Sequence, residues 1–240
     1  MTILLLAGTR EAREIAVAAT EQGVALVASL AGTTREPVRL GVPTRIGGFG
    51  GSAGFVQYLK NHHITAVLDA THPFAHRISN RSARLCAELG LPYCQLLRLP
   101  WSLDDGWLSL AREEDLAAHV SAEQTVFLAT GRQTLAHFAN LRHARVICRQ
   151  IEPPDGPFPF PSGQYHIARP PFSVADEIRL FRELGVDWLV AKNAGGETSR
   201  SKLDAARALD LRVALIERPP QPPGDKAETV EECLSWIHAL

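Results

Sequence analysis

The first glycine turn of the chain has the residues of a phosphate site. An apolar run, Ile3 to Leu6, leads into Ala7-Gly8-Thr9, and an amphipathic segment follows. A strand, a glycine turn and a helix start leave backbone N–H groups and the positive helix end available to a phosphate. The turn has one glycine where the dinucleotide fingerprint has three, and similar turns occur in many α/β proteins. Gly8 and Thr9 are therefore candidate phosphate-binding residues, with an ordinary tight turn as the alternative.

The end of the second apolar run carries hydroxyls and a cation instead of a carboxylate. It consists of Ser29-Leu30-Ala31-Gly32-Thr33-Thr34-Arg35, and the first acidic residue is Glu36. A carboxylate at this place binds the ribose hydroxyls of NAD, whereas an arginine accepts the extra phosphate of NADP. In a dinucleotide-binding fold the pattern favours NADPH, bound by Gly32, Thr33 and Arg35. The alternative is that Arg35 is a solvated loop residue.

A glycine-rich segment, residues 47–54, follows the third apolar run. Its glycines allow backbone to approach a ligand closely, and Gly48 is the candidate binding residue. Ser52 has the side chain of a helix cap for the segment that follows. A flexible linker is the alternative, but the segment lies where an α/β sheet binds ligands.

Polar residues follow the fourth apolar run, in Asp69-Ala70-Thr71-His72-Pro73-Phe74-Ala75-His76. Thr71 and His72 are expected at the ligand-binding edge of the sheet, with His72 a candidate for proton transfer. His72 and His76 are four residues apart, but Pro73 interrupts a helix and no third ligand is evident, so no metal site is predicted. The basic residues that follow share one helix face, which suits an anionic ligand or a solvated surface; they are Arg77, Arg81 and Arg84.

Two turns in the second half of the chain have the same character. Thr130-Gly131-Arg132 follows one apolar run, and Lys192-Asn193-Ala194-Gly195-Gly196 follows another. Each alone is modest evidence for an anion site. Together with the first-half turns they predict a ligand cleft between two halves of the molecule. The sequence lacks the motifs of several other enzyme classes. It has no P-loop, no G-x-S-x-G elbow of a hydrolase and no Tyr followed four residues later by Lys, the catalytic pair of short-chain dehydrogenases.

These turns require a scaffold of parallel strands. Short, continuous apolar runs alternate with amphipathic segments, a pattern typical of strands buried on both faces and joined by helices. It predicts an α/β fold with two Rossmann-like, doubly wound parallel-sheet domains, residues 1–99 and 100–240, and a loop over residues 100–114. The predicted strands are 3–6, 24–30, 42–46, 66–68, 93–97, 125–129, 144–148, 188–191 and 213–216, and the predicted helices include 11–22, 53–61, 79–89 and 175–184.

Composition limits the classes of partner. Of 240 residues, 45% are hydrophobic and 21% charged, and the net charge of −1 provides no field for nucleic acid or an anionic membrane. The apolar start is too short to span a bilayer. Four cysteines without a C-x-x-C pair indicate buried thiols of a reducing compartment, so the chain is expected in the cytoplasm. The sequence predicts no oligomeric state.

Four segments together resemble the precorrin-6A reductases of cobalamin biosynthesis. They are residues 7–13, 69–75, 130–132 and 192–196, in the order of the family and over nearly the whole chain. The run Asp-Ala-Thr-His-Pro-Phe-Ala is the most specific of them. Ala7 is a departure, because the family often has another glycine there.

The resemblance implies reduction of one double bond of a tetrapyrrole, precorrin-6A, to give precorrin-6B. NADPH would supply the hydride, and a proton, from His72 or from water, would be added at the neighbouring carbon. The implied cofactor-binding residues are Gly8, Thr9, Gly32, Thr33, Arg35, Gly48, Thr130, Gly131 and Arg132. The implied substrate-binding residues are Thr71, Arg77, Lys192, Asn193, Gly195 and Gly196.

Three alternatives stay open. In the first, the substrate is the cobalt-containing precorrin-6A of the oxygen-independent route. In the second, the substrate is another anionic metabolite. In the third, the chain is a non-catalytic NADP-binding redox sensor. A sensor would not need the loops of the second half, and their presence favours an enzyme.

Overall fold

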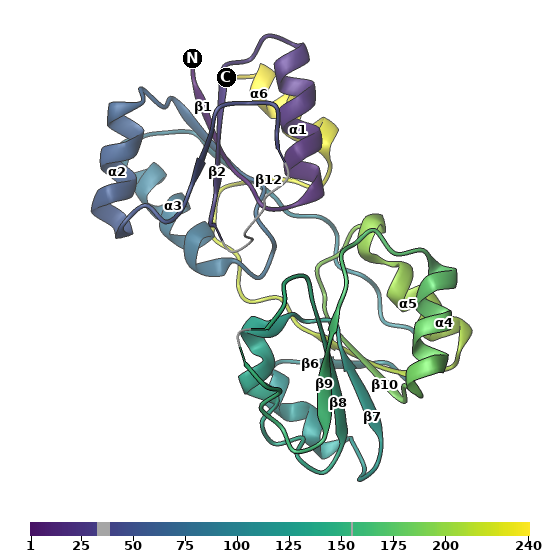
Figure 1. The fold of residues 1–240 in the computed structure, drawn as a ribbon. Coiled ribbons are helices and arrows are strands. Elements are labelled where there is room, and N and C mark those ends of the chain that lie inside the picture. The colour runs from purple at the N-terminus through teal and green to yellow at the C-terminus, as the bar shows by residue number, and fades with distance from the viewer. Residues whose placement is uncertain (33–38, 155) are drawn as a thin grey trace. The chain divides into compact units, whose positions relative to one another are not determined.

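The computed structural model describes residues 1–32, 39–154 and 156–240. The chain forms two compact units, one comprising Met1–Leu99 and Pro219–Leu240, the other Pro100–Arg218 (Figure 1). Each unit contains a six-stranded sheet in which neighbouring strands are parallel. The predicted fold class, two Rossmann-like parallel-sheet domains, is confirmed.

The first sheet has the strand order of dinucleotide-binding domains. Its order is β12-β5-β4-β1-β2-β3, so the winding direction reverses between β1 and β4. The strands are β1 (Ile3–Leu6), β2 (Leu26–Leu30), β3 (Thr44–Ile46), β4 (Ala66–Asp69), β5 (Tyr93–Leu96) and β12 (Asp225–Ala227). The helices of this unit are α1 (Arg10–Glu21), α2 (Gly51–Asn61), α3 (His76–Leu89) and α6 (Val230–His238).

The alternation of side chains along β1 builds two cores. Ile3 and Leu5 pack with α1 and α6 on one face of the sheet. Leu4 and Leu6 pack with α2 and α3 on the other. All four side chains are at most 2% exposed, which explains why the strand is a continuous apolar run.

The second sheet repeats the same order, β9-β8-β7-β10-β11-β6. The α4–α5 pair packs on one face, against Phe127, Leu189 and Leu215 among others. The strands are β6 (Leu108–Leu110), β7 (Thr125–Leu128), β8 (Arg145–Gln150), β9 (Gly163–Ile167), β10 (Trp188–Lys192) and β11 (Arg212–Ile216). The helical segments are η1 (Glu113–Ala118), η2 (Arg132–Phe138), α4 (Val174–Leu184), η3 (Glu197–Ser199) and α5 (Ser201–Ala208).

The C-terminal segment departs from the prediction that residues 100–240 form one domain. β12 pairs with β5 of the first sheet, and α6 packs against α1. The strand β6 lies within the segment 100–114, which was predicted to be a loop, and it completes the second sheet beside β11. The first sheet therefore takes its sixth strand from beyond the second unit, whereas all six strands of the second sheet lie within the continuous segment Pro100–Arg218.

Three strands were not predicted, and one predicted helix cap is wrong. The missed strands β6, β9 and β12 lie at sheet edges and have partly exposed residues, so they lack a continuous apolar run. Ser52 lies inside α2, whose N-cap is Gly50 without a side-chain cap bond. Where helices end in glycine, Gly90 and Gly185 adopt the left-handed conformation.

Replacing Ile237 by Ala tests whether the C-terminal helix belongs to the core of the first unit. The side chain is 1% exposed, and a buried Ile→Ala change leaves a cavity. We expect the free energy of unfolding, measured with urea, to fall by about 2 to 4 kcal/mol. Leu240→Ala, at a residue that is 44% exposed, is the control and should change it little. Equal small effects of both substitutions would contradict the packing of α6.

Candidate functional site

The first glycine turn is joined to the loop after β4. Thr9 is the N-cap of α1, and its Oγ1 accepts a hydrogen bond from Ala12 N at 3.1 Å. The same hydroxyl donates to the carbonyl of Ala70 at 2.8 Å. Gly8 has φ of +150°, and a Cβ built on it meets no atom within 4 Å. The predicted pair Gly8 and Thr9 thus forms an open backbone cradle at the N-terminus of a twelve-residue helix.

A buried carboxylate fixes the loop after β4. Asp69 is 0% exposed, and its Oδ1 accepts hydrogen bonds from Thr71 N at 3.0 Å and Thr71 Oγ1 at 2.6 Å. Its Oδ2 accepts from the Tyr93 hydroxyl at 2.8 Å. Burial, followed by the Asp69 charge, raises the pKa of Tyr93, so this phenol remains a donor. Thr71 gives its proton to Asp69 and can offer a ligand an acceptor oxygen.

His72 lies exposed at the end of that loop. Its Nδ1 accepts a hydrogen bond from Phe74 N at 3.2 Å. In a neutral imidazole with this bond, the ring proton is on Nε2. His76 begins α3, and among the described residues no group of three or more His, Cys, Asp or Glu side chains could hold a metal ion.

An arginine that the sequence did not single out organises the loop after β3. Arg45 Nη1 donates to Ser29 Oγ at 2.8 Å and to the carbonyl of Gly47 at 2.7 Å. Its Nη2 donates to the carbonyl of Gly48 at 2.9 Å. A Cβ on Gly54 would lie 1.8 Å from the carbonyl oxygen of Phe49, so α2 can pack against this loop only with glycine there.

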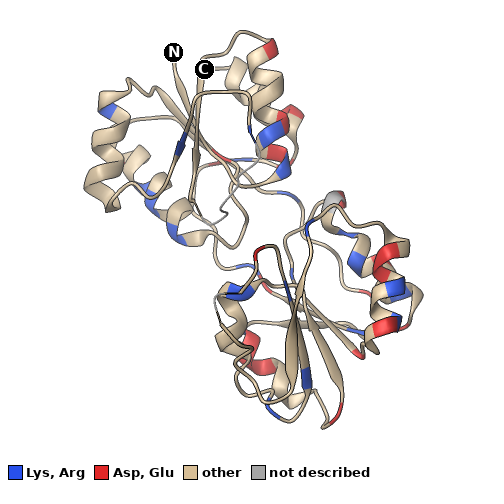
Figure 2. Ribbon diagram, viewed as in Figure 1, with Lys and Arg blue, Asp and Glu red and all other residues tan. Residues whose placement is uncertain are grey.

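The other first-unit candidates lie on the same edge or outside the described residues. Gly32 follows β2 and has φ of +79°, and a Cβ there would lie 3.3 Å from Ile46 Cγ2. Arg77 is exposed in the first turn of α3, where Figure 2 shows basic residues. Thr33 and Arg35 lie outside the residues that the structure describes.

In the second unit, the turn after β7 has buried polar groups. Thr130 is 7% exposed, Gly131 has φ of +79°, and Arg132 begins η2. Gln150 ends the neighbouring strand β8 and is 5% exposed. Within the described part of the chain, Thr130 Oγ1 and both amide atoms of Gln150 have no hydrogen-bond partner. Sequence analysis missed Gln150, because its burial depends on the packing of the sheet.

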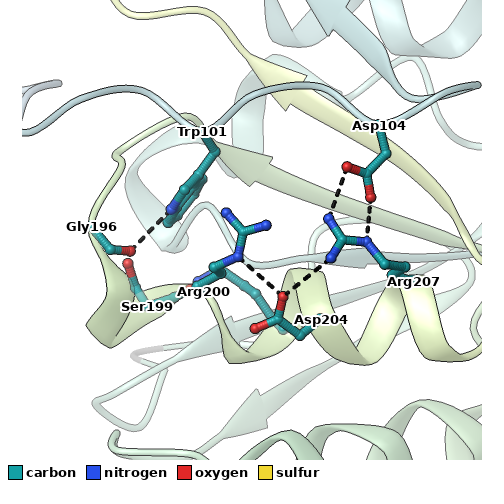
Figure 3. A network of polar contacts seen from close by, with 8 residues as sticks. Trp101, Asp104, Gly196, Ser199, Arg200, Asp204 and Arg207 are labelled. Atoms are coloured by element: carbon teal, nitrogen blue, oxygen red, sulfur yellow. Dashed lines mark hydrogen bonds and ion pairs between the residues drawn. The ribbon is translucent and has the colours of Figure 1, made fainter.

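The loop after β10 is held by a tryptophan. Asn193 Oδ1 accepts from Trp101 N at 2.8 Å, and its Nδ2 donates to the carbonyl of Trp101 at 3.0 Å. Trp101 Nε1 donates to the carbonyl of Gly196 at 3.0 Å, as Figure 3 shows. The structure therefore gives the Asn193 amide a positioning role within the loop that contains Gly195 and Gly196. Lys192 is half-buried, and burial lowers its pKa, with Glu113 opposing the shift.

A second lysine, missed by sequence analysis, lies under the same tryptophan. Lys202 Nζ lies 5.4 Å from the centroid of the Trp101 ring and donates to the carbonyl of Ser199. Burial lowers the pKa of Lys202 to about 8, and Glu177 opposes that shift. Glu177 forms a two-pronged ion pair with Arg149, with N···O distances of 2.8 and 2.5 Å. Its charge is therefore already neutralised next to Lys202.

Replacing Asp69 by Asn tests whether the carboxylate fixes the β4 loop. The amide would place an NH₂ group where one carboxylate oxygen accepts a hydrogen bond, and one buried donor would lose its acceptor. We expect a loss of about 1 to 3 kcal/mol in the free energy of unfolding. Glu21→Gln, on the exposed end of α1, is the control. Equal stability of the Asp69→Asn variant and the wild type would show that the carboxylate does not hold the loop.

The lowered pKa of the half-buried Lys202 predicts a pH dependence of stability. Its pKa is about 8 in the folded protein against 10.5 ordinarily, so between these values the unfolded chain binds more protons. Wild-type stability should therefore rise with pH across this window relative to Lys202→Met. We expect the variant to be more stable below pH 8, by at most about 3 kcal/mol, and the difference to shrink towards pH 10.5. Urea unfolding at several pH values measures this, with Lys60→Met as the exposed control; a pH-independent difference would contradict the shift.

Known proteins and one family model match this chain over nearly its whole length. Residues 2–238 match the family model described as precorrin-6x reductase CbiJ/CobK. A Rhodobacter capsulatus protein named precorrin-6A reductase is 42% identical, over 98% of this chain and 95% of that one. A Priestia megaterium protein named cobalt-precorrin-6A reductase is 29% identical, over 99% and 97%.

A solved structure shows the same fold and the same family. It is titled CobK precorrin-6A reductase and has a TM-score of 0.95 at 40% identity, covering 100% of this chain and 96% of its own. The resemblance identified from four sequence segments is thereby confirmed. The chain belongs to the precorrin-6x reductase CbiJ/CobK family.

Proposed function

We propose that this chain reduces precorrin-6A to precorrin-6B with NADPH. Membership of the family supports the reaction, and the greater identity to a relative named for precorrin-6A, 42% against 29%, favours the substrate without cobalt. The observation that carries the proposal is the turn at Gly8 and Thr9. It combines an open cradle, a capped helix N-terminus and a bond to the β4 loop, at the point where the strand order reverses.

The residues of the first unit fit a nicotinamide dinucleotide, which supplies a hydride when bound. Gly8 and Thr9 would hold its pyrophosphate, because the space that a Cβ would fill at Gly8 is open. Gly32 and Gly48 present backbone at the ends of β2 and β3. Thr33 and Arg35 remain predicted contacts of the adenosine phosphate. In the second unit Thr130, Gly131 and Arg132 remain predicted cofactor contacts.

We propose that His72 donates the proton to the carbon next to the one that receives hydride. His72 is exposed at the end of the β4 loop, which the bond between Thr9 and Ala70 joins to the glycine turn of the cofactor site. Asp69 acts through Thr71 and holds the loop that carries His72. Donation from water is the alternative, and the His72→Ala variant below distinguishes the two.

The carboxylates of the tetrapyrrole require cations and N–H donors. Arg77 and Lys192 would supply charge, and Gly195 and Gly196 would supply backbone N–H groups. Thr71, whose proton goes to Asp69, would accept a hydrogen bond from a donor of the substrate. Asn193 would act by shaping its loop. No helix within the described ranges is long and apolar enough to cross a membrane. Because all four cysteines are buried and free, we place the reaction in the cytoplasm.

Purified protein mixed with precorrin-6A should oxidise NADPH in step with a change in the macrocycle spectrum. NADH should support a much slower reaction, since it lacks the phosphate that the loop after β2 is predicted to bind. Cobalt-precorrin-6A is the parallel substrate, and faster turnover of it would contradict the choice of metal-free substrate. Tight NADPH binding without oxidation on either substrate would favour the redox sensor.

The variant His72→Ala tests the proton donor. We expect turnover to fall about 100-fold, within the range of general acid catalysis, with an unchanged dissociation constant for NADPH. His76→Ala is the matched control, because His76 is also exposed and lies four residues further on. Unchanged turnover in His72→Ala would assign the proton to water.

A further inference from the structure

Arg45 is bound on one side and open on another. Three of its five N–H groups donate to Ser29 Oγ and to the carbonyls of Gly47 and Gly48. Its guanidinium carbon lies 4.0 Å from the ring centroid of Phe49 and 5.3 Å from that of Tyr58. Nε–H and one N–H of Nη2 remain without a hydrogen-bond acceptor among the described residues. A guanidinium presents such N–H groups as a fork that binds phosphate or carboxylate oxygens in pairs.

The charge of Arg45 is not neutralised within the described part of the chain. Arg45 makes no ion pair with a described acidic residue; its partners are a hydroxyl, two carbonyls and two rings. Arg81 of α3 lies 5.9 Å from the Phe49 centroid, and it too has no ion pair with a described carboxylate. By contrast, Arg84 on the same helix is paired with Glu88. Two uncompensated arginines around one aromatic ring make this spot attractive to an anion.

The position of Arg45 fits one part of a dinucleotide. In this fold the ribose next to the adenine lies at the end of β2, and an arginine nearby accommodates a 2′-phosphate. Arg45 reaches the end of β2 through its bond to Ser29, across the β2–β3 pairing that sets these two residues side by side.

We propose that Arg45 binds the 2′-phosphate of NADPH through Nε–H and Nη2–H and so determines the preference for NADPH over NADH. This inference rests on the proposed function, because it assumes a nicotinamide dinucleotide at the first sheet. The competing role is structural, in which Arg45 only supports the loop of Gly47 and Gly48. A support affects all dinucleotides alike, whereas a phosphate ligand affects only those with a 2′-phosphate.

The test compares four ligands on the full-length protein by isothermal titration calorimetry. The ligands are NADPH, NADH, 2′,5′-ADP and 5′-AMP, and the two adenine nucleotides isolate the phosphate from the nicotinamide. Arg45→Gln removes the charge, while Arg45→Lys keeps a charge but loses the fork. Lys60→Gln, which removes an exposed positive charge from α2, is the matched control.

We expect Arg45→Gln to weaken NADPH and 2′,5′-ADP about 10- to 100-fold, with NADH and 5′-AMP changed less than about threefold. Arg45→Lys should fall between, and it serves as the readout if Arg45→Gln does not fold. Equal weakening of NADPH and NADH, or no change in either, would overturn the inference and leave the proposed function standing. Wild-type protein that binds NADPH no more tightly than NADH would instead overturn the cofactor assignment.

Discussion

The parallel direction of the strands is the constraint on which the rest of the structure depends. Parallel strands need crossover connections, so helices cover the faces of the sheet and the strands are apolar along their length. The interior of β1, for example, offers no polar side chain. Chemistry is therefore confined to the loops where strands end. All carboxyl ends of one sheet lie at one edge, so turns far apart in sequence become neighbours there, as the bond between Thr9 and Ala70 shows.

The edge strand β12 ties the first unit to a distant part of the chain. The first sheet is completed by β12, which follows the whole second unit, and the second sheet begins with β6, which follows β5. The chain consequently passes between the units twice, near residues 99–100 and 218–219. Gln221, just after the second passage, bonds to Gln95 and to the carbonyl of Pro73, so the returning segment is fastened to the first unit before β12 begins.

The sequence predicted most of the scaffold because central strands have their own signal. β1 has the predicted bounds, and the interior strands β7, β8, β10 and β11 differ from the prediction by one or two residues at their ends. The edge strands β6, β9 and β12 were missed, because partial exposure removes the apolar run and pairing alone defines them. The destination of residues 219–240 was missed for the same reason, since it depends on which sheet offers an open edge beside β5.

The loops of the site were predicted, but the residues that hold them were mostly not. Asp69 stood in the quoted segment without a role, since its full burial and its bond to Tyr93 are tertiary facts. Arg45 and Lys202 gave no sequence signal, because neither lies in a glycine turn. Asn193 stays a predicted substrate contact, and the bonds of its amide to Trp101, at the other end of the second unit, were not predicted.

The central claim is that the carboxyl edge of the first sheet holds the dinucleotide. Hydrogen exchange of the backbone amides, measured with and without NADP⁺, tests it directly, because bound phosphate and ribose protect the N–H groups they contact. The account predicts slower exchange in residues 7–12 and 45–54, at the turns of Gly8 and Gly48. Protection confined to residues 129–134 or 192–200 of the second unit would contradict it.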